Sequence, residues 1–137
     1  MGELFIVRNA GNTVDTVALG STEYAVGVLG VPLIVVMGHQ RCGAVEAAVK
    51  VVTENASYPG SIGRMIEPIV PAVLSARAKG NGDLLEASIR ANVSRTVDRL
   101  RTASEPMLLQ PLQAKKLRIV GAVYELDDGT VDFFDEG

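Results

Sequence analysis

The 137-residue chain has one Cys, one His and no Trp, and aromatic residues make up only 4% of it. A single Cys excludes an internal disulfide and is compatible with a reducing compartment, so we expect a cytoplasmic protein. No apolar run is long enough to cross a membrane, which excludes a membrane-spanning protein. The formal net charge of −3 comes from mixed signs, so nothing indicates a nucleic-acid partner. What remains is a core of aliphatic residues in one domain, residues 1–137.

Apolar runs and turn signals predict the strands of this domain. Residues 4–7, 31–37 and 117–126 are nearly continuous apolar runs, which is typical of strands buried on both faces of a sheet. Asp-Asp-Gly at 127–129 indicates a hairpin turn, so we expect residues 130–134 to return as an antiparallel strand.

Helical spacing fills the intervals between these strands. Helices are expected at about 15–29, 43–54, 62–74 and 83–102, with a weaker one before Lys115. Pro68 and Pro71 should kink or split the third of these. In the first, the apolar residues fall on one side of the helix: Val17, Ala18, Tyr24, Ala25, Val28 and Leu29. Strands separated by helices predict an α/β fold, a mostly parallel sheet flanked by helices with an antiparallel C-terminal edge strand.

The only His and the only Cys lie three residues apart, where the second predicted strand meets its helix. His39 and Cys42 would therefore lie at the carboxyl end of a strand, where open α/β sheets bind their ligands. Imidazole and thiolate are good zinc ligands, and zinc prefers four of them in a tetrahedron. A lone His-x-x-Cys is also frequent by chance, and a buried Cys is often only structural.

Four segments of the chain resemble, in the same order, segments of the β-class carbonic anhydrases. They are LFIVRNAGN at 4–12, GSTEYA at 20–25, VVMGHQRCGAV at 35–45 and LRIVGAVY at 117–124. The resemblance implies a zinc enzyme that hydrates carbon dioxide reversibly to bicarbonate, built as a homodimer or higher homo-oligomer. In that family two Cys and one His hold the zinc, and His39 and Cys42 match the His and the second Cys.

The resemblance also identifies what this chain does not contain. The family's first zinc-ligating Cys belongs to a Cys-x-Asp-Ser-Arg segment that should precede residue 4, and the sequence has no second Cys. The Asp and Arg of that segment, a dyad that orients the zinc-bound solvent, are missing with it, so no catalytic residue is assigned. Its strand lies between those matched by residues 4–7 and 31–37. Without that strand we expect one of three arrangements: the two matched strands pair directly, another chain fills the gap between them, or the sequence is a truncated part of a longer protein.

These departures predict weakly bound or absent Zn²⁺ and weak or lost carbon dioxide hydration. One alternative is a catalytically inactive homologue that acts as an assembly or regulatory subunit. Another is a thiol enzyme using Cys42, because the positive end of a helix favours a thiolate. Arg41 is expected to be solvated, Arg8 and Asn9 to support their loop, and Asp15 to lie near the site without replacing a ligand.

Overall fold

The computed structural model describes residues 2–80 and 82–136 and shows a three-stranded mixed sheet in the order β1–β2–β3. Its strands are β1 (Leu33–His39), β2 (Arg118–Tyr124) and β3 (Val131–Asp135). β1 and β2 are parallel, with His39 opposite Tyr124, and β3 returns antiparallel along β2. The predicted α/β class and the antiparallel C-terminal edge strand are confirmed.

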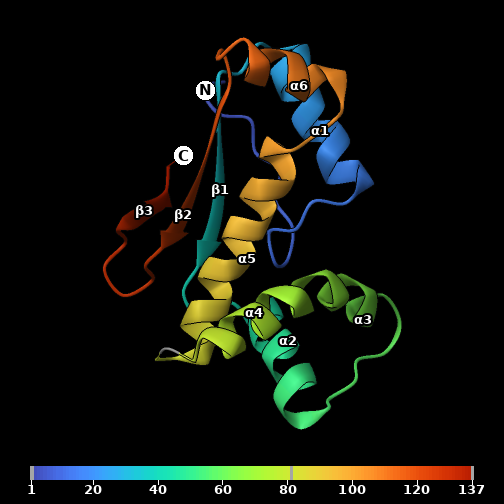
Figure 1. Ribbon diagram of the computed structural model, residues 1–137, viewed down its shortest axis with the longest axis vertical. Coiled ribbons are helices and arrows are strands. Elements are labelled where there is room, and N and C mark those ends of the chain that lie inside the picture. Colours follow the sequence, from blue (N-terminus) through green and yellow to red (C-terminus); the bar gives the residue numbers. More distant parts are fainter. Residues whose placement is uncertain (1, 81, 137) are drawn as a thin grey trace.

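The helices are arranged around one long central helix (Figure 1). They are α1 (Thr16–Gly27), α2 (Gly43–Glu54), α3 (Gly60–Ile66), the 3₁₀ turn η1 (Glu67–Ile69), α4 (Val70–Lys79), α5 (Leu84–Arg101) and α6 (Pro106–Gln113). α5 runs along the sheet, α1 and α6 lie together at one end of it, and α2 to α4 lie at the other. The predicted split at Pro68 and Pro71 is confirmed, because the chain changes from α3 through η1 to α4 there.

α5 lies close to the sheet because two glycines face it. Asp83 begins this helix by accepting hydrogen bonds from the N–H groups of Leu85 and Glu86, which satisfies donors that a helix start leaves open. Val93 of α5 is fully buried. A Cβ atom at Gly38 in β1 or Gly121 in β2 would lie 2.8 or 2.9 Å from the Val93 methyl groups. The apolar core therefore forms directly behind the carboxyl half of β1.

The prediction of a buried strand at residues 4–7 is wrong. These residues form no strand, and Leu4 and Ile6 are 81% and 72% exposed. β1 is an outer strand of the described sheet, and residues 4–7 do not pair with it. An apolar run becomes a strand only where a neighbour accepts its backbone hydrogen bonds. Direct pairing between the two segments, one of the three expected outcomes, is therefore excluded.

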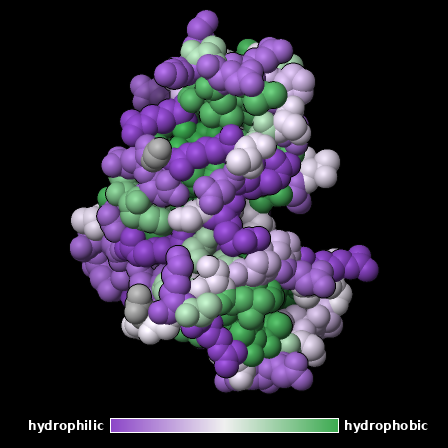
Figure 2. Space-filling view, in the orientation of Figure 1, coloured by the Kyte–Doolittle hydropathy of each residue, from purple (hydrophilic) through white to green (hydrophobic). Residues whose placement is uncertain are grey.

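The predicted apolar side of the first helix is only partly buried. Ala18 and Ala25 are buried, but Val17 and Tyr24 are 76% and 52% exposed. The two apolar residues after the helix, Val28 and Leu29, are also more than half exposed. In Figure 2 apolar side chains gather at the α1–α6 end of the molecule and again at the α2–α4 end, with polar side chains between them. Among the helices of the described residues, none combines the length and apolar character that a membrane span requires.

Candidate metal centre

His39 and Cys42 lie where the sequence predicted, at the junction of a strand and a helix. His39 is the last residue of β1, and Cys42 immediately precedes α2 as its N-cap. Between them Arg41 adopts a left-handed backbone with φ of 53°, a conformation that few residues other than Gly adopt. This tight turn brings the carboxyl end of β1 directly onto the start of α2.

The His39 side chain is exposed and is oriented by its own loop. Its Nδ1 atom lies 2.8 Å from the carbonyl oxygen of Gln40. A carbonyl oxygen can only accept, so Nδ1 is the donor in this hydrogen bond, and a neutral imidazole held this way would carry its lone pair on Nε2. A backbone carbonyl on the second ring nitrogen is the usual support of a metal-ligating His. His39 alone therefore has the arrangement of a ligand that binds through Nε2.

Cys42 occupies a different environment from His39. The residue is only 4% exposed and belongs to an apolar cluster with Val45, Ile69 and Val123. It makes no side-chain hydrogen bond to the start of α2. A free thiol in such surroundings packs as a small hydrophobe.

The donor set around these two residues is incomplete for zinc. Among residues 2–80 and 82–136, no group of three or more His, Cys, Asp or Glu side chains could hold a metal ion. Zinc in proteins is held by three or four such ligands. The described residues therefore do not fit a complete zinc site.

The other predicted neighbours of the site have structural contacts. Asn9 donates a hydrogen bond from Nδ2 to the carbonyl oxygen of Thr13 at 2.8 Å, so it closes the loop before α1. Asp15 is the N-cap of α1 and accepts from the N–H of Ala18 at 2.8 Å. Arg8 is exposed and has no ion pair within the described residues. These findings agree with the predicted support of the loop by Asn9, while Asp15 contributes to the helix.

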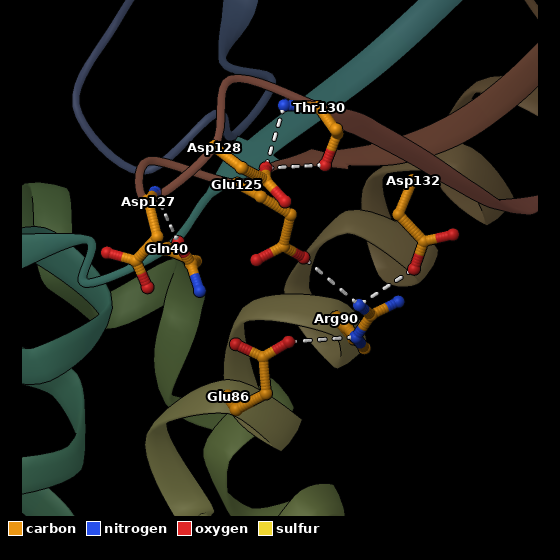
Figure 3. Close-up of polar contacts among 8 residues, drawn as sticks. All are labelled: Gln40, Glu86, Arg90, Glu125, Asp127, Asp128, Thr130 and Asp132. Carbon is orange, nitrogen blue, oxygen red and sulfur yellow. Dashed lines mark hydrogen bonds and ion pairs between the residues drawn. The ribbon is translucent and has the colours of Figure 1, made fainter.

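Sequence reasoning missed the contacts that hold the loop between the two candidate ligands. The prediction that Arg41 is solvated is incomplete, since it remains exposed but its Nη1 lies 3.0 Å from Oδ1 of Asp127. Gln40 also contacts Asp127, because the Gln40 Oε1 accepts a hydrogen bond from the Asp127 N–H at 3.3 Å. Figure 3 shows the Gln40–Asp127 contact beside the carboxylates around Arg90. Only the topology could have predicted these contacts. The carboxyl ends of the parallel strands β1 and β2 must lie side by side, so the loop after β1 lies next to the turn after β2.

A shallow cavity lies elsewhere, between α5 and the loop before α1. It measures about 190 Å³ and is lined by Thr13, Val14, Pro68, Asn92, Arg95, Thr96 and Arg99. Neither His39 nor Cys42 lines it, so the candidate metal centre is a surface loop over a buried thiol and is not part of this cavity.

Comparison with known proteins decides the family. Residues 1–131 match the family model described as carbonic anhydrase. The structure also superposes on the β-carbonic anhydrase CcaA with a TM-score of 0.79 and 26% identity, covering 98% of this chain and 72% of that one. The chain belongs to the β-carbonic anhydrase family. A chain from a study of two tetrameric β-carbonic anhydrases of Sordaria macrospora shares the fold, with a TM-score of 0.83 and 23% identity. The match covers 97% of this chain and 68% of that one.

Curated carbonic anhydrases match over nearly the whole of this β-carbonic anhydrase chain. It is 41% identical over 129 residues to carbonic anhydrase 2 of Mycobacterium tuberculosis, covering 94% of this chain and 61% of the relative. It is 40% identical over 132 residues to a carbonic anhydrase of Mycolicibacterium smegmatis, covering 96% and 63%. The chain thus spans about three fifths of the length of these relatives.

Proposed function

We propose that this chain is a β-carbonic anhydrase unit with an incomplete zinc site, formed by His39 and Cys42. One observation carries the proposal: the two residues that match the family's ligands flank the tight turn from β1 into α2, and no group of three or more His, Cys, Asp or Glu side chains among the described residues could hold a metal ion. By family, its substrate is carbon dioxide or bicarbonate and its metal is Zn²⁺, and the single free Cys supports a cytoplasmic setting.

The number of ligands sets the expected zinc affinity. A complete structural zinc site contributes about 10–16 kcal/mol of binding free energy. If four ligands share this equally, two of them supply about 5–8 kcal/mol, which corresponds to dissociation constants of roughly 1–200 µM. Zinc held so weakly is lost during purification, and carbon dioxide hydration is weak or absent.

Elemental analysis of the purified chain tests this proposal. We expect well under one zinc per chain, a hydration rate close to the uncatalysed one, and micromolar or weaker zinc binding that His39→Ala and Cys42→Ser each weaken further. Glu54→Gln, at the far end of α2, is the control variant. A version of the protein extended to the length of its relatives should be measured beside it. Near-stoichiometric zinc with brisk hydration in the 137-residue chain would overturn the proposal.

A second candidate function is assembly, with little or no catalysis. It is supported by the exposed apolar residues on and beside β1, of which Leu33, Val35 and Met37 alternate along one face of the strand. An outer strand of this kind presents unpaired backbone groups and apolar side chains together, which favours pairing with another chain. The proposed partner is a second copy of the same chain. Static light scattering tests it, and a monomer at micromolar concentration would count against it.

A further inference from the structure

The hairpin between β2 and β3 contacts both residues that separate the two candidate ligands. Asp127, in this hairpin turn, pairs with Arg41 at 3.0 Å through its side chain and donates its N–H to Gln40 Oε1 at 3.3 Å. The Gln40 N–H also donates to the Tyr124 carbonyl oxygen at 3.0 Å, which extends the β1–β2 pairing by one residue beyond His39. The loop is therefore held from one side by a segment more than 80 residues away in the sequence.

These contacts act on the parts of the loop that most need support. Arg41 has a left-handed backbone, and a residue other than Gly keeps such a conformation only where its surroundings enforce it. The Gln40 carbonyl oxygen, which accepts from His39 Nδ1, belongs to the peptide that leads into Arg41. Fixing Gln40 and Arg41 therefore also fixes the orientation of the imidazole and the path of the chain into Cys42.

The hairpin is itself rigid and anchored, so it can bear this role. Within the turn, Asp128 accepts from both the N–H and the hydroxyl of Thr130, at 3.0 and 2.7 Å. At its base, Arg90 of α5 lies 2.9 Å from a carboxylate oxygen of Asp132 and 3.6 Å from one of Glu125 (Figure 3). Polar contacts therefore tie the hairpin to the central helix at its base and to the His39–Cys42 loop at its turn.

We propose that the β2–β3 hairpin is a clamp that positions the His39–Cys42 loop, with Asp127 as its contact residue, and that keeps the Cys42 thiol covered. Asp127 is a positioning residue in this scheme, since it acts through Gln40 and Arg41. The clamp's relevance to metal binding rests on the proposed function, but its contacts are made by the chain alone. It can therefore be tested without metal.

The single Cys provides a probe that reports on this loop alone. In chelator-treated protein, alkylation of Cys42 under native conditions measures how often the buried thiol becomes accessible. Arg41 and Asp127 are 60% and 70% exposed, and exposed ion pairs contribute little. We therefore expect Asp127→Ala and Arg41→Gln each to speed alkylation about twofold to fivefold, equal to roughly 0.4–1 kcal/mol at 1.4 kcal/mol per tenfold. Adding Gln40→Ala to Asp127→Ala should increase the rate further.

Two controls separate opening of the loop from general destabilisation. Glu54→Ala removes a carboxylate from the opposite end of α2 and should leave the rate unchanged, and urea unfolding of each variant gives the contribution of global unfolding. Salt is a further readout, because 1 M salt shortens the screening length to about 3 Å. High salt should speed alkylation of the unaltered chain but not of Asp127→Ala.

The clamp is overturned if the Asp127→Ala, Gln40→Ala double variant is alkylated no faster than Glu54→Ala. It is equally overturned if the lost global stability accounts for the whole increase in rate. Zinc content does not enter this experiment, so its failure and the failure of the proposed function are distinguishable.

Discussion

Gly38→Ala should destabilise the protein because the residue before His39 lies against the central helix. A Cβ atom at position 38 would lie 2.8 Å from Val93 Cγ2, closer than such atoms approach, and 3.4 Å from Ile89 Cγ2. Val93 is fully buried, and a β-branched side chain within a helix has essentially one χ1 rotamer. The clash therefore cannot be relieved by rotating Val93 and must displace β1 from α5.

The magnitude follows from overpacking and from the unfolded chain. Overpacking a core by one methyl group costs about 1–3 kcal/mol. Replacing Gly by Ala also lowers the conformational entropy of the unfolded chain, which stabilises the folded protein by about 0.4–1 kcal/mol. The net loss in free energy of unfolding should therefore be about 1–2 kcal/mol. Val93→Ala alone should cost about 2 kcal/mol through two lost methyl groups and the cavity they leave. In the Val93→Ala background the Cβ atom has room, and Gly38→Ala should then cost nothing or be slightly stabilising.

Urea unfolding of the four proteins in this cycle measures the interaction, with unchanged m-values as the sign that only stability has changed. Gly20→Ala is the matched control, because it lies inside α1 with nothing within 4 Å of the new Cβ atom. It should stabilise the protein by about 0.5–1 kcal/mol. The reasoning is refuted if Gly38→Ala costs the same with and without Val93, or costs nothing in the unaltered chain.

Two further predictions concern a helix cap and the carboxylates whose pKa is lowered. Asp83→Ala removes the acceptor for two N–H groups at the start of α5, at 2.8 and 3.2 Å, and should cost about 1 kcal/mol in urea unfolding, with most of the loss absent in Asp83→Asn. The pKa of Glu105 is lowered from 4.5 by hydrogen bonds from its own backbone N–H and from Arg99, and the pKa of Asp128 is lowered from 3.8 by the N–H and hydroxyl of Thr130. A carboxyl group whose pKa is lower in the folded than in the unfolded protein stabilises the fold while it is ionised. The free energy of unfolding should therefore fall as the pH drops below about 4.5. Glu105→Gln should show a smaller fall between pH 7 and pH 3, and an identical fall would contradict the assignment.

Local sequence signals were sufficient for most of this fold. α5 could be predicted because Asp83, a regular apolar period and terminal arginines all agree on its limits. The split between α3 and α4 could be predicted because Pro68 and Pro71 act through their own backbone. The place of His39 and Cys42 followed from a strand that runs directly into a helix. In each of these cases the cause lies within a few residues of its effect.

The remaining features depend on residues that are distant in the sequence. The contacts of Asp127 with Gln40 and Arg41 join segments about 87 residues apart, and no local pattern marks them. The apolar side predicted for α1 leaves Val17 and Tyr24 exposed, because helical spacing shows which side chains share a side but not what covers that side. α6 packs against α1, and the buried residues of α1 are only Ala18, Ala25 and Val26.

We infer that the unpaired segment at residues 4–7 and the incomplete donor set of the proposed zinc site have one physical cause. Residues 4–7 have the composition of a buried strand but no neighbour, and β1, the strand that carries His39, is an outer strand of the described sheet. By resemblance, the family places a strand between these two segments, and its final residues supply a Cys, an Asp and an Arg. Parallel strands end at the same edge of a sheet, so a strand added along β1 in parallel would end beside His39 and Cys42. Filling this single gap would therefore pair the exposed apolar run and bring a third zinc ligand to the site.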